Sequence, residues 1–234
     1  MTHISVIIPT YQHAITLPRA LDSIFAQTLA PLEVIVVDDG STDATVSVLA
    51  PYRDKISYIH QQNQGAPVAR NRGFQIAKGE FVIFWDADVV AEPTMLEKLA
   101  KALTHCPLAS WAYSSFWWGR RLFRGHPFNA DALRSQNYIH TSALIRRKDF
   151  PGFDESLKRF QDWDLWLTMN EQGKVGVFVD EPLYHVLVAS DRRSYSRWLP
   201  KFVYRIPWKW IHWSPSAIRG YEAAHAVIVR KHHL

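Results

Sequence analysis

The chain has 234 residues, of which 47% are hydrophobic and 21% charged, and this is long enough for one large globular domain. The composition excludes a disordered tail, a collagen-like fibre and a coiled coil, and the single cysteine, Cys106, excludes an internal disulfide framework. The formal net charge of +5 and the ten tryptophans suit nucleic acid, a membrane surface or an anionic substrate.

Short apolar runs alternate with helical patterns over the first hundred residues. The runs are rich in β-branched or aromatic residues, and they predict strands at 4–8, 34–37, 56–59 and 81–85. Helical spacing, capping residues and an initial proline predict helices at 14–27, 42–49, 66–77 and 93–103. Strands joined by helical crossovers indicate an α/β fold, with a mostly parallel sheet covered by helices on both faces.

The second half of the chain has a different pattern. Aromatic and apolar runs predict strands at 109–118, 138–145 and 175–179, and a helix is predicted at 162–170. Residues 119–137 are basic and contain glycine and proline, so we expect a loop there. No flexible glycine- and serine-rich tract separates the two halves, which favours one compact domain.

Polar residues directly follow three of the predicted strands. They are Thr10-Tyr11-Gln12, Asp38-Asp39 and Asp86-Ala87-Asp88. Ligands of parallel α/β sheets bind at the carboxyl ends of the strands, so we expect the three clusters to meet in one cleft. The carboxylates of Asp86 and Asp88 repel each other unless a cation neutralises them, and a hard divalent ion would do so. The alternative is a solvated turn or a helix cap.

Two further segments carry candidate functional side chains. Arg70 and Arg72 lie near the start of a predicted helix, where a guanidinium and the helix end can both hold a phosphate. Asp162 and Asp164 stand among aromatic residues, which raise a carboxyl pKa and so suit a general base. The alternatives are solvated arginines in the first segment and, in the second, a helix start capped by Asp162.

Taken together, these segments resemble the family 2 glycosyltransferases, which have the GT-A fold. The resemblance runs from Ile4 to about His185. The segments that carry it are SVIIPTY at 5–11, VVDDGSTD at 36–43, Gly65 with ARNRG at 69–73, WDAD at 85–88, and GFDE at 152–155 followed by QDWDL at 161–165. It implies a Rossmann-like, mostly parallel sheet with a smaller acceptor-side subregion. We divide the chain into a donor half (residues 1–105), an acceptor half (106–190) and a C-terminal segment (191–234).

The resemblance also implies an activity. Such enzymes move a sugar from a nucleoside-diphosphate donor to an acceptor hydroxyl with inversion at the anomeric carbon, and they use Mn²⁺ or Mg²⁺. The implied pathways are cell-surface polysaccharide, lipopolysaccharide or glycan assembly, with a glycan or a lipid-linked acceptor. Two alternatives remain open: a GT-A-like nucleotidyltransferase, and a non-catalytic nucleotide-sugar-binding partner subunit. The segment Pro9-Thr10-Tyr11-Gln12 lacks the glycine and lysine of a triphosphate loop, which argues against the first.

Residue roles follow from the same resemblance. Asp162 matches the general base, Asp39 would meet the nucleotide base and Asp38 would support its loop. Asp86 and Asp88 would hold the metal ion, with His185 as a third ligand, a lid residue or a locally bonded histidine. The implied nucleotide-binding residues are Pro9, Thr10, Tyr11, Asp38, Asp39, Arg70 and Asp86. Two positions depart from the family pattern, because Gln12 stands where asparagine is common and Gln161 where glutamate is common.

Most of the positive charge lies in one C-terminal segment. Residues 192–213 contain no acid and interleave basic residues with four tryptophans, so they suit an anionic membrane surface. The alternative is that these tryptophans pack on the catalytic domain. Nucleic acid is not expected as a partner, because no nucleic-acid-binding motif accompanies the charge. The chain shows no signal peptide and no apolar run of 18 residues, so we expect a cytoplasmic protein, peripheral on the inner face of the membrane.

Overall fold

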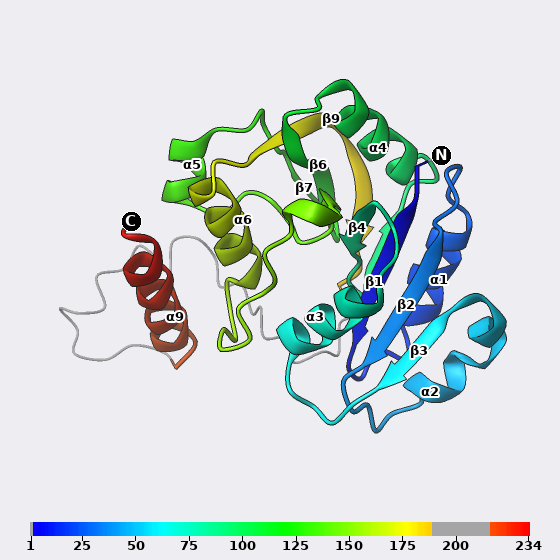
Figure 1. Cartoon of the computed structure of the whole chain (residues 1–234). Helices are drawn as coiled ribbons and strands as arrows, with labels where there is room; N and C mark the ends of the chain where they lie inside the picture. Colours follow the sequence, from blue (N-terminus) through cyan, green and yellow to red (C-terminus); the bar gives the residue numbers. More distant parts are fainter. Residues whose placement is uncertain (1, 189–215) are drawn as a thin grey trace.

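The computed structural model describes residues 2–188 and 216–234, so the basic segment 192–213 lies outside the described residues (Figure 1). The described residues form an α/β fold around one mixed, nine-stranded sheet. Its strand order is β3-β2-β1-β4-β8-β6-β9-β5, and β7 pairs with β6. No helix in these described ranges is long and apolar enough to cross a membrane.

The donor half supplies the parallel part of the sheet. Its strands are β1 (Ile4–Thr10), β2 (Glu33–Asp38), β3 (Ser57–His60) and β4 (Phe81–Phe84). All four predicted strands are confirmed, and β1 is the centre of a parallel group flanked by β2 and β4. The helices of this half are α1 (Leu17–Phe25), α2 (Thr45–Val48), α3 (Ala66–Ile76) and α4 (Met95–His105), with a 3₁₀ helix, η1, at Ala50–Lys55.

The acceptor half extends the sheet with mostly antiparallel strands. They are β6 (Ala109–Trp118), β7 (Arg121–Phe123), β8 (Leu144–Arg146) and β9 (Val175–Val186), joined by β5 (Val89–Ala91) from the donor half. Its helices are α5 (Ala130–Ser135), η2 (Arg147–Asp149) and α6 (Gln161–Glu171), and α9 (Ser216–His232) lies in the C-terminal segment.

Two hydrophobic cores cover the two faces of the sheet. Side chains alternate across β1, because successive residues of a strand point to opposite faces. Val6 and Ile8 join the core under α1 and α4, whereas Ile7 joins the core under α3 and α6. The prediction of helices on both faces is therefore confirmed.

Three local predictions are wrong, and each has a structural reason. The strand predicted at 138–145 is paired only at 144–146, because residues 137–143 run into the cleft instead of along the sheet. The loop predicted at 119–137 contains β7 and the short helix α5, which Asn129 caps through a bond from Ala132 N to Asn129 Oδ1. The helix predicted to end at 49 is a single α-helical turn that continues as a 3₁₀ helix.

The contact between α3 and the sheet depends on a glycine. A Cβ atom at Gly73 would lie 2.5 Å from Ile7 Cγ2 and 3.2 Å from Val37 Cγ2. The missing side chain lets the helix lie close to β1 and β2, and α3 carries Arg70 toward the carboxyl ends of these strands.

We expect Gly73→Ala to lower the free energy of unfolding by about 1–3 kcal/mol, because the added methyl group overpacks a core. Gly220→Ala in α9 is the matched control: its Cβ would be 4.0 Å from Arg159 Nη2 and would have open space. Alanine there should be neutral or stabilise by up to about 1 kcal/mol. Urea unfolding of both variants measures the difference, and equal effects would contradict the packing argument.

Candidate active site

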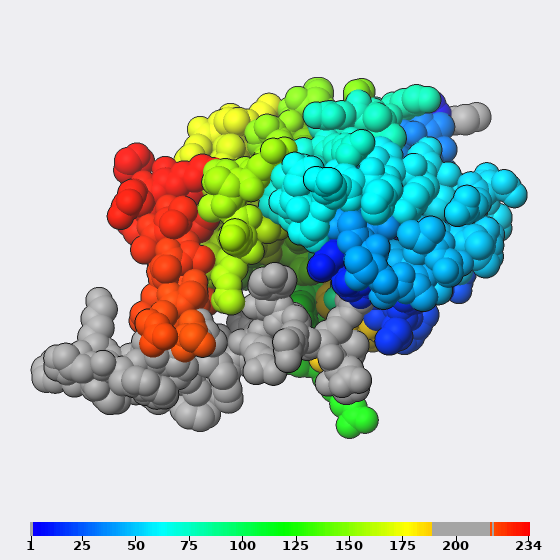
Figure 2. All heavy atoms as spheres, turned by 90° about the horizontal axis from the view of Figure 1, so that it is seen from below, coloured from blue at the N-terminus to red at the C-terminus, as the bar shows by residue number. Residues whose placement is uncertain are grey.

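The carboxyl ends of β1, β2 and β4 lie together at one edge of the sheet, as predicted from the strand order. Thr10 pairs with Asp38 in the parallel register, and Asp86 follows β4 on the other side of β1. These strands run toward the lower edge in Figure 1. Figure 2 looks onto that edge, where the dark blue atoms of the chain's first residues lie between the light blue donor half and the yellow-green acceptor half.

Asp38 supports the loop that follows β2. Its side chain is fully buried, and Oδ1 accepts a hydrogen bond from Ser41 N at 2.9 Å. Oδ2 accepts a second bond from the Tyr58 hydroxyl at 2.9 Å. Burial and this hydrogen bond raise the pKa of Tyr58 to about 12, so the phenol stays a donor. These two bonds tie Asp38 to its own loop and to β3.

Asp39 joins the end of β2 to the loop that leads into α3. Its Oδ1 accepts bonds from Gln61 Nε2 at 2.8 Å and Gln64 N at 2.9 Å, and its Oδ2 accepts one from Gly65 N at 2.8 Å. A carboxylate offers about four acceptor positions, so these three bonds leave room for one more donor from a ligand.

The end of β1 lies beside the end of β2. Pro9 and Thr10 are buried, and Tyr11 is half exposed at the rim. Thr10 Oγ1 is a buried polar atom that has no hydrogen-bond partner in the described part of the chain. Gln12 has a positive φ of 58° and links the loops after β1 and β2, since its Nε2 donates to Thr42 Oγ1 at 2.7 Å. A buried hydroxyl without a partner suits a ligand donor or acceptor at this point.

Arg70 connects the two halves of the site. It projects from α3, is only 7% exposed, and donates from Nη2 to Asp86 Oδ1 and from Nη1 to Gln161 Oε1, both at 2.8 Å. Its guanidinium also lies over the Phe153 ring, 5.1 Å from the centroid. The neutral amide of Gln161 therefore binds an Arg70 guanidinium that is already paired with the Asp86 carboxylate.

Asp86 is held in its charged form by its neighbours. Burial acts to raise the pKa of its carboxyl group, but the Arg70 guanidinium and the nearby His140 outweigh burial and lower the pKa. His140 Nε2 lies 3.7 Å from Asp86 Oδ2. Asp86 is thus an ionised carboxylate at the end of β4, which is the state that a divalent cation or a cationic side chain requires.

Asp162 has the opposite electrostatic character. Burial raises the pKa of its carboxyl group, although His140, Trp163 N and Asn137 act against that rise. Asn137 Nδ2 donates to Oδ2 at 2.7 Å and Trp163 N donates to Oδ1 at 2.9 Å. A carboxylate with a raised pKa, fixed at the start of α6, can accept a proton from a substrate hydroxyl.

His140 lies between these two carboxylates, and sequence reasoning missed it as a site residue. Its Nδ1 accepts a bond from Ser142 N at 3.2 Å, so the neutral ring carries its proton on Nε2. Burial lowers its pKa and keeps the ring neutral, and the ring packs against Phe116 and Tyr184, whose rings stack on each other. Asn137 was also missed. His140 comes from the segment that was predicted as a strand and Asn137 from the end of the segment that was predicted as a loop, and no local pattern marks them.

Asp88 and His185 lie farther along the same edge. Leu187 N donates to the Asp88 carbonyl oxygen at 2.8 Å, which ties the turn after β4 to the end of β9. The His185 ring stacks on Trp117, and its Nε2 lies 3.8 Å from Glu92 Oε1. Its neighbour Tyr184 points to the other face of β9, toward His140.

The metal ligands predicted from the sequence form no complete protein site. Within residues 2–188 and 216–234, no three His, Cys, Asp or Glu side chains are grouped so that they could hold a metal ion. The partners of His185 differ from those expected of a third ligand beside Asp86 and Asp88. The two aspartates still offer hard carboxylate oxygens, which suit Mn²⁺ or Mg²⁺ when a ligand's own oxygens complete the coordination.

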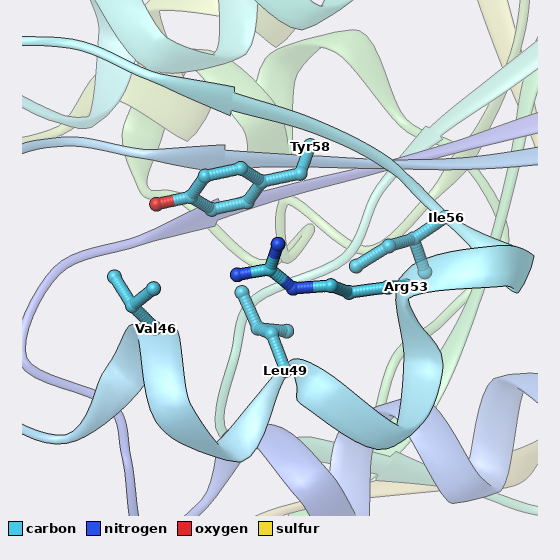
Figure 3. Close-up of a pocket in the computed structure, with 5 residues that line it drawn as sticks. All are labelled: Val46, Leu49, Arg53, Ile56 and Tyr58. Atoms are coloured by element: carbon cyan, nitrogen blue, oxygen red, sulfur yellow. The ribbon is translucent and has the colours of Figure 1, made fainter.

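A separate hollow of about 270 Å³ lies between α2, η1 and β3. Figure 3 shows the Arg53 guanidinium extending into it between Tyr58 and Leu49. None of the predicted site residues lines this hollow. It touches the site only through Tyr58, whose hydroxyl bonds Asp38.

Comparison with known proteins agrees with this geometry. The family model described as "Glycosyl transferase family 2" matches residues 5–151. The "Uncharacterized glycosyltransferase YibD" of Escherichia coli K12 is 42% identical over 99 residues, which cover 41% of this chain and 29% of that protein. The first three curated relatives are matched over 29 to 38% of their length, so the chain spans about a third of each.

Solved structures share the fold. S. aureus TarS 1-349 in complex with UDP-GlcNAc has a TM-score of 0.68 at 21% identity, over 93% of this chain and 69% of that one. The mannosyltransferase PcManGT of Pyrobaculum calidifontis, in complex with GDP-Man and Mn²⁺, has a TM-score of 0.64 at 20% identity, over 97% of this chain and 69% of that one. Because the sequence identities are this low, the two matches show that the fold is shared.

We expect Arg70→Met to lower the free energy of unfolding by about 2–4 kcal/mol, because it leaves the Asp86 carboxylate without its main counter-charge. The matched control is Arg72→Met, two residues along α3, because Arg72 is exposed and makes one 3.3 Å bond to Gln61. Its loss should cost less than about 1 kcal/mol. Denaturant unfolding compares them, and equal costs would show that the Arg70 bridge contributes no special stability.

Proposed function

Because the chain belongs to glycosyl transferase family 2, we propose that it transfers a sugar from a nucleoside-diphosphate-sugar donor to an acceptor hydroxyl, with inversion at the anomeric carbon. One observation carries this proposal. Two carboxyl groups with opposite pKa shifts lie beside His140: the pKa of Asp86 is lowered and that of Asp162 is raised. Arg70 joins the segments that carry them, because it bonds Asp86 and Gln161. The ionised Asp86 suits the side of the leaving nucleoside diphosphate, and Asp162 suits the role of general base.

The donor would be bound by the ends of β1, β2 and β4. Thr10 Oγ1 and the remaining acceptor position of Asp39 would meet the nucleoside, with Pro9, Tyr11 and the Asp38-supported loop forming its pocket. Arg70 would face the diphosphate, since a guanidinium fits phosphate oxygens well. Its Nε is buried and has no hydrogen-bond partner among the described residues, so it is available for such a contact.

Asp86 and Asp88 would hold Mn²⁺ or Mg²⁺ together with diphosphate oxygens. When bound, a divalent ion stabilises the negative charge that develops on the leaving nucleoside diphosphate. The donor set fits such an ion, because the lowered pKa of Asp86 keeps its carboxylate ionised at neutral pH. PcManGT, a structure of the same fold, is described with GDP-Man and Mn²⁺. His185, whose ring stacks on Trp117, remains a candidate third ligand of this set.

The chemistry needs one base and no covalent intermediate. Asp162 takes the proton from the acceptor hydroxyl, the acceptor oxygen bonds to the anomeric carbon, and the bond from that carbon to the diphosphate oxygen breaks. The nucleoside diphosphate leaves with the electron pair, and Asp162 later releases its proton to solvent. Two hydrogen bonds keep the Asp162 carboxylate oriented during this step, because Asn137 donates to Oδ2 and the Trp163 amide donates to Oδ1.

The acceptor and the cellular setting complete the proposal. We favour a glycan or lipid-linked acceptor in cell-surface polysaccharide, lipopolysaccharide or glycan assembly, at the cytoplasmic face of a membrane. The basic residues 192–213 support this setting by their sequence alone, and their contact with an anionic membrane stays a prediction. The family match favours sugar transfer over nucleotidyl transfer or a purely binding role.

We expect Asp162→Asn to lower kcat by about 10²–10⁴-fold, the usual contribution of a general base. Affinity for the nucleoside diphosphate should change by less than about twofold, because the donor contacts lie on other elements. Asp131→Asn, at an exposed position on α5, is the matched control. Full activity of Asp162→Asn would remove Asp162 from the role of base.

The pH profile of the unchanged enzyme gives a second readout of the same residue. The base is active only when it is deprotonated, so kcat/KM rises with pH through the pKa of Asp162. Because burial raises that pKa, the acid limb should lie above the ordinary aspartate value of about 3.9. An acid limb at or below that value would contradict the assignment.

Metal dependence is the next expected outcome. Chelation should abolish transfer, and added Mn²⁺ or Mg²⁺ should restore it, because the leaving group needs a counter-charge. Asp88→Asn should raise the metal concentration needed for half-maximal rate. Full activity after complete metal removal would exclude this arrangement.

A thermal-shift screen of UDP- and GDP-sugars with and without Mn²⁺ identifies the donor before these assays.

A further inference from the structure

The C-terminal helix α9 packs on the back of α6, the helix that carries Asp162. Figure 1 shows the red α9 beside the yellow-green α6 on the side away from the sheet, and Figure 2 shows the same neighbourhood from below. One side of α9 faces α6 through residues spaced alternately by three and four, as expected of a helix seam. They are Ile218, Tyr221, His225, Ile228 and His232.

A polar cluster locks the end of α9 to the first turn of α6. Asp164 is only 3% exposed, and its Oδ1 lies 2.7 Å from Lys231 Nζ and 2.8 Å from His232 Nε2. His232 is 2% exposed, and its Nδ1 lies 2.8 Å from Glu171 Oε1 at the other end of α6. The mechanism uses none of these groups, although Asp164 and His232 are almost completely buried.

Lys231 also holds the loop that precedes α6. Its Nζ lies 2.7 Å from Asp154 Oδ2, and this bond is the main cause that lowers the pKa of Asp154 to about 2. Burial acts to lower the pKa of Lys231, but its bonds to Asp154 and Asp164 outweigh burial and raise it. Lys231 is therefore a fixed cation between the two segments that bracket the entry to α6.

The backbone at that entry is strained and needs support. Phe160, directly before α6, has a φ of 58° and a ψ of 27°, which is the left-handed region and is unfavourable for a bulky residue. Its ring contacts Tyr221 and His225 of α9, with centroids 5.2 Å and 6.2 Å apart. The two residues after it are Gln161, which Arg70 holds, and Asp162.

Asp162 and Asp164 sit on opposite sides of the same helical turn, because two residues rotate the helix by about 200°. Asp162 points into the cleft toward Asn137, and Asp164 points back toward α9. Without Lys231, the buried Asp164 carboxylate would lose its main counter-charge. A buried unpaired charge is strongly unfavourable, so the first turn would shift to bring that carboxylate to water.

We propose that α9 is a positioning element for catalysis, in which Lys231 and His232 fix Asp164 and thereby hold Asp162 at the orientation needed for proton transfer. The inference rests on the proposed role of Asp162 as the base. Small displacements of a catalytic group reduce rates strongly, so the effect belongs to kcat. The donor contacts should be spared, because Asn71 binds Phe153 N and O and holds that loop to α3 independently.

The test compares three variants of the full chain. Lys231→Met should lower kcat about tenfold or more, with the donor KM changed by less than about twofold. Lys231→Arg keeps the charge and should recover most of kcat. Arg230→Met, at the adjacent exposed position, is the matched control and should match the unchanged enzyme.

Hydrogen exchange of the α6 first turn supplies a readout that is independent of activity. Amides at 161–166 should exchange faster in Lys231→Met than in Arg230→Met. A variant that loses thermal stability but keeps kcat and this protection would overturn the inference, since α9 would then be structural only. If the unchanged protein transfers no sugar, the proposed function fails and the inference fails with it; normal transfer with an unaffected Lys231→Met removes the inference alone.

Discussion

The site is organised by one buried cation, Arg70. A buried guanidinium is costly unless it is paired, and Arg70, which is 7% exposed, finds partners for its two Nη atoms on two separate parts of the chain. Asp86 follows β4 of the donor half and Gln161 begins α6 of the acceptor half, and Arg70 bonds both at 2.8 Å. Arg70 therefore ties the end of β4 to the start of α6.

This arrangement gives two nearby carboxyl groups opposite properties. Asp86 contacts Arg70 directly, so its pKa falls although it is buried. At Asp162 burial outweighs the opposing effects of His140, the Trp163 amide, Asn137 and Arg70, so its pKa rises. His140 stays neutral between them, because burial lowers its own pKa. Environments that separate the pKa values of two carboxyl groups assign them different chemical tasks. The glutamine at position 161 fits this scheme, since a second acid there would compete with Asp86 for Arg70.

The acceptor half is held in place from its far side. Phe160 adopts a left-handed conformation at the start of α6, and the aromatic side chains of α9 cover it. The buried Asp164 carboxylate has its counter-charge on α9, in Lys231, and a second contact from His232. One helical turn therefore carries the proposed base on one side and an anchor to the C-terminal helix on the other.

Local patterns in the sequence determined the donor half and the outline of the site. The strands β1 to β4, the polar residues at their ends and the position of Asp162 at a helix start could be predicted because each depends on neighbours in the chain. Tertiary structure alone decided which side chains meet. Asn137 comes from a segment that was predicted as a loop and His140 from one that was predicted as a strand, yet both lie beside the two site carboxylates. His185 pairs with Trp117 and Glu92, and α9 binds α6 across 68 residues of sequence. Burial and charge pairing between distant segments set these contacts, and neither is encoded in the periodicity of a single segment.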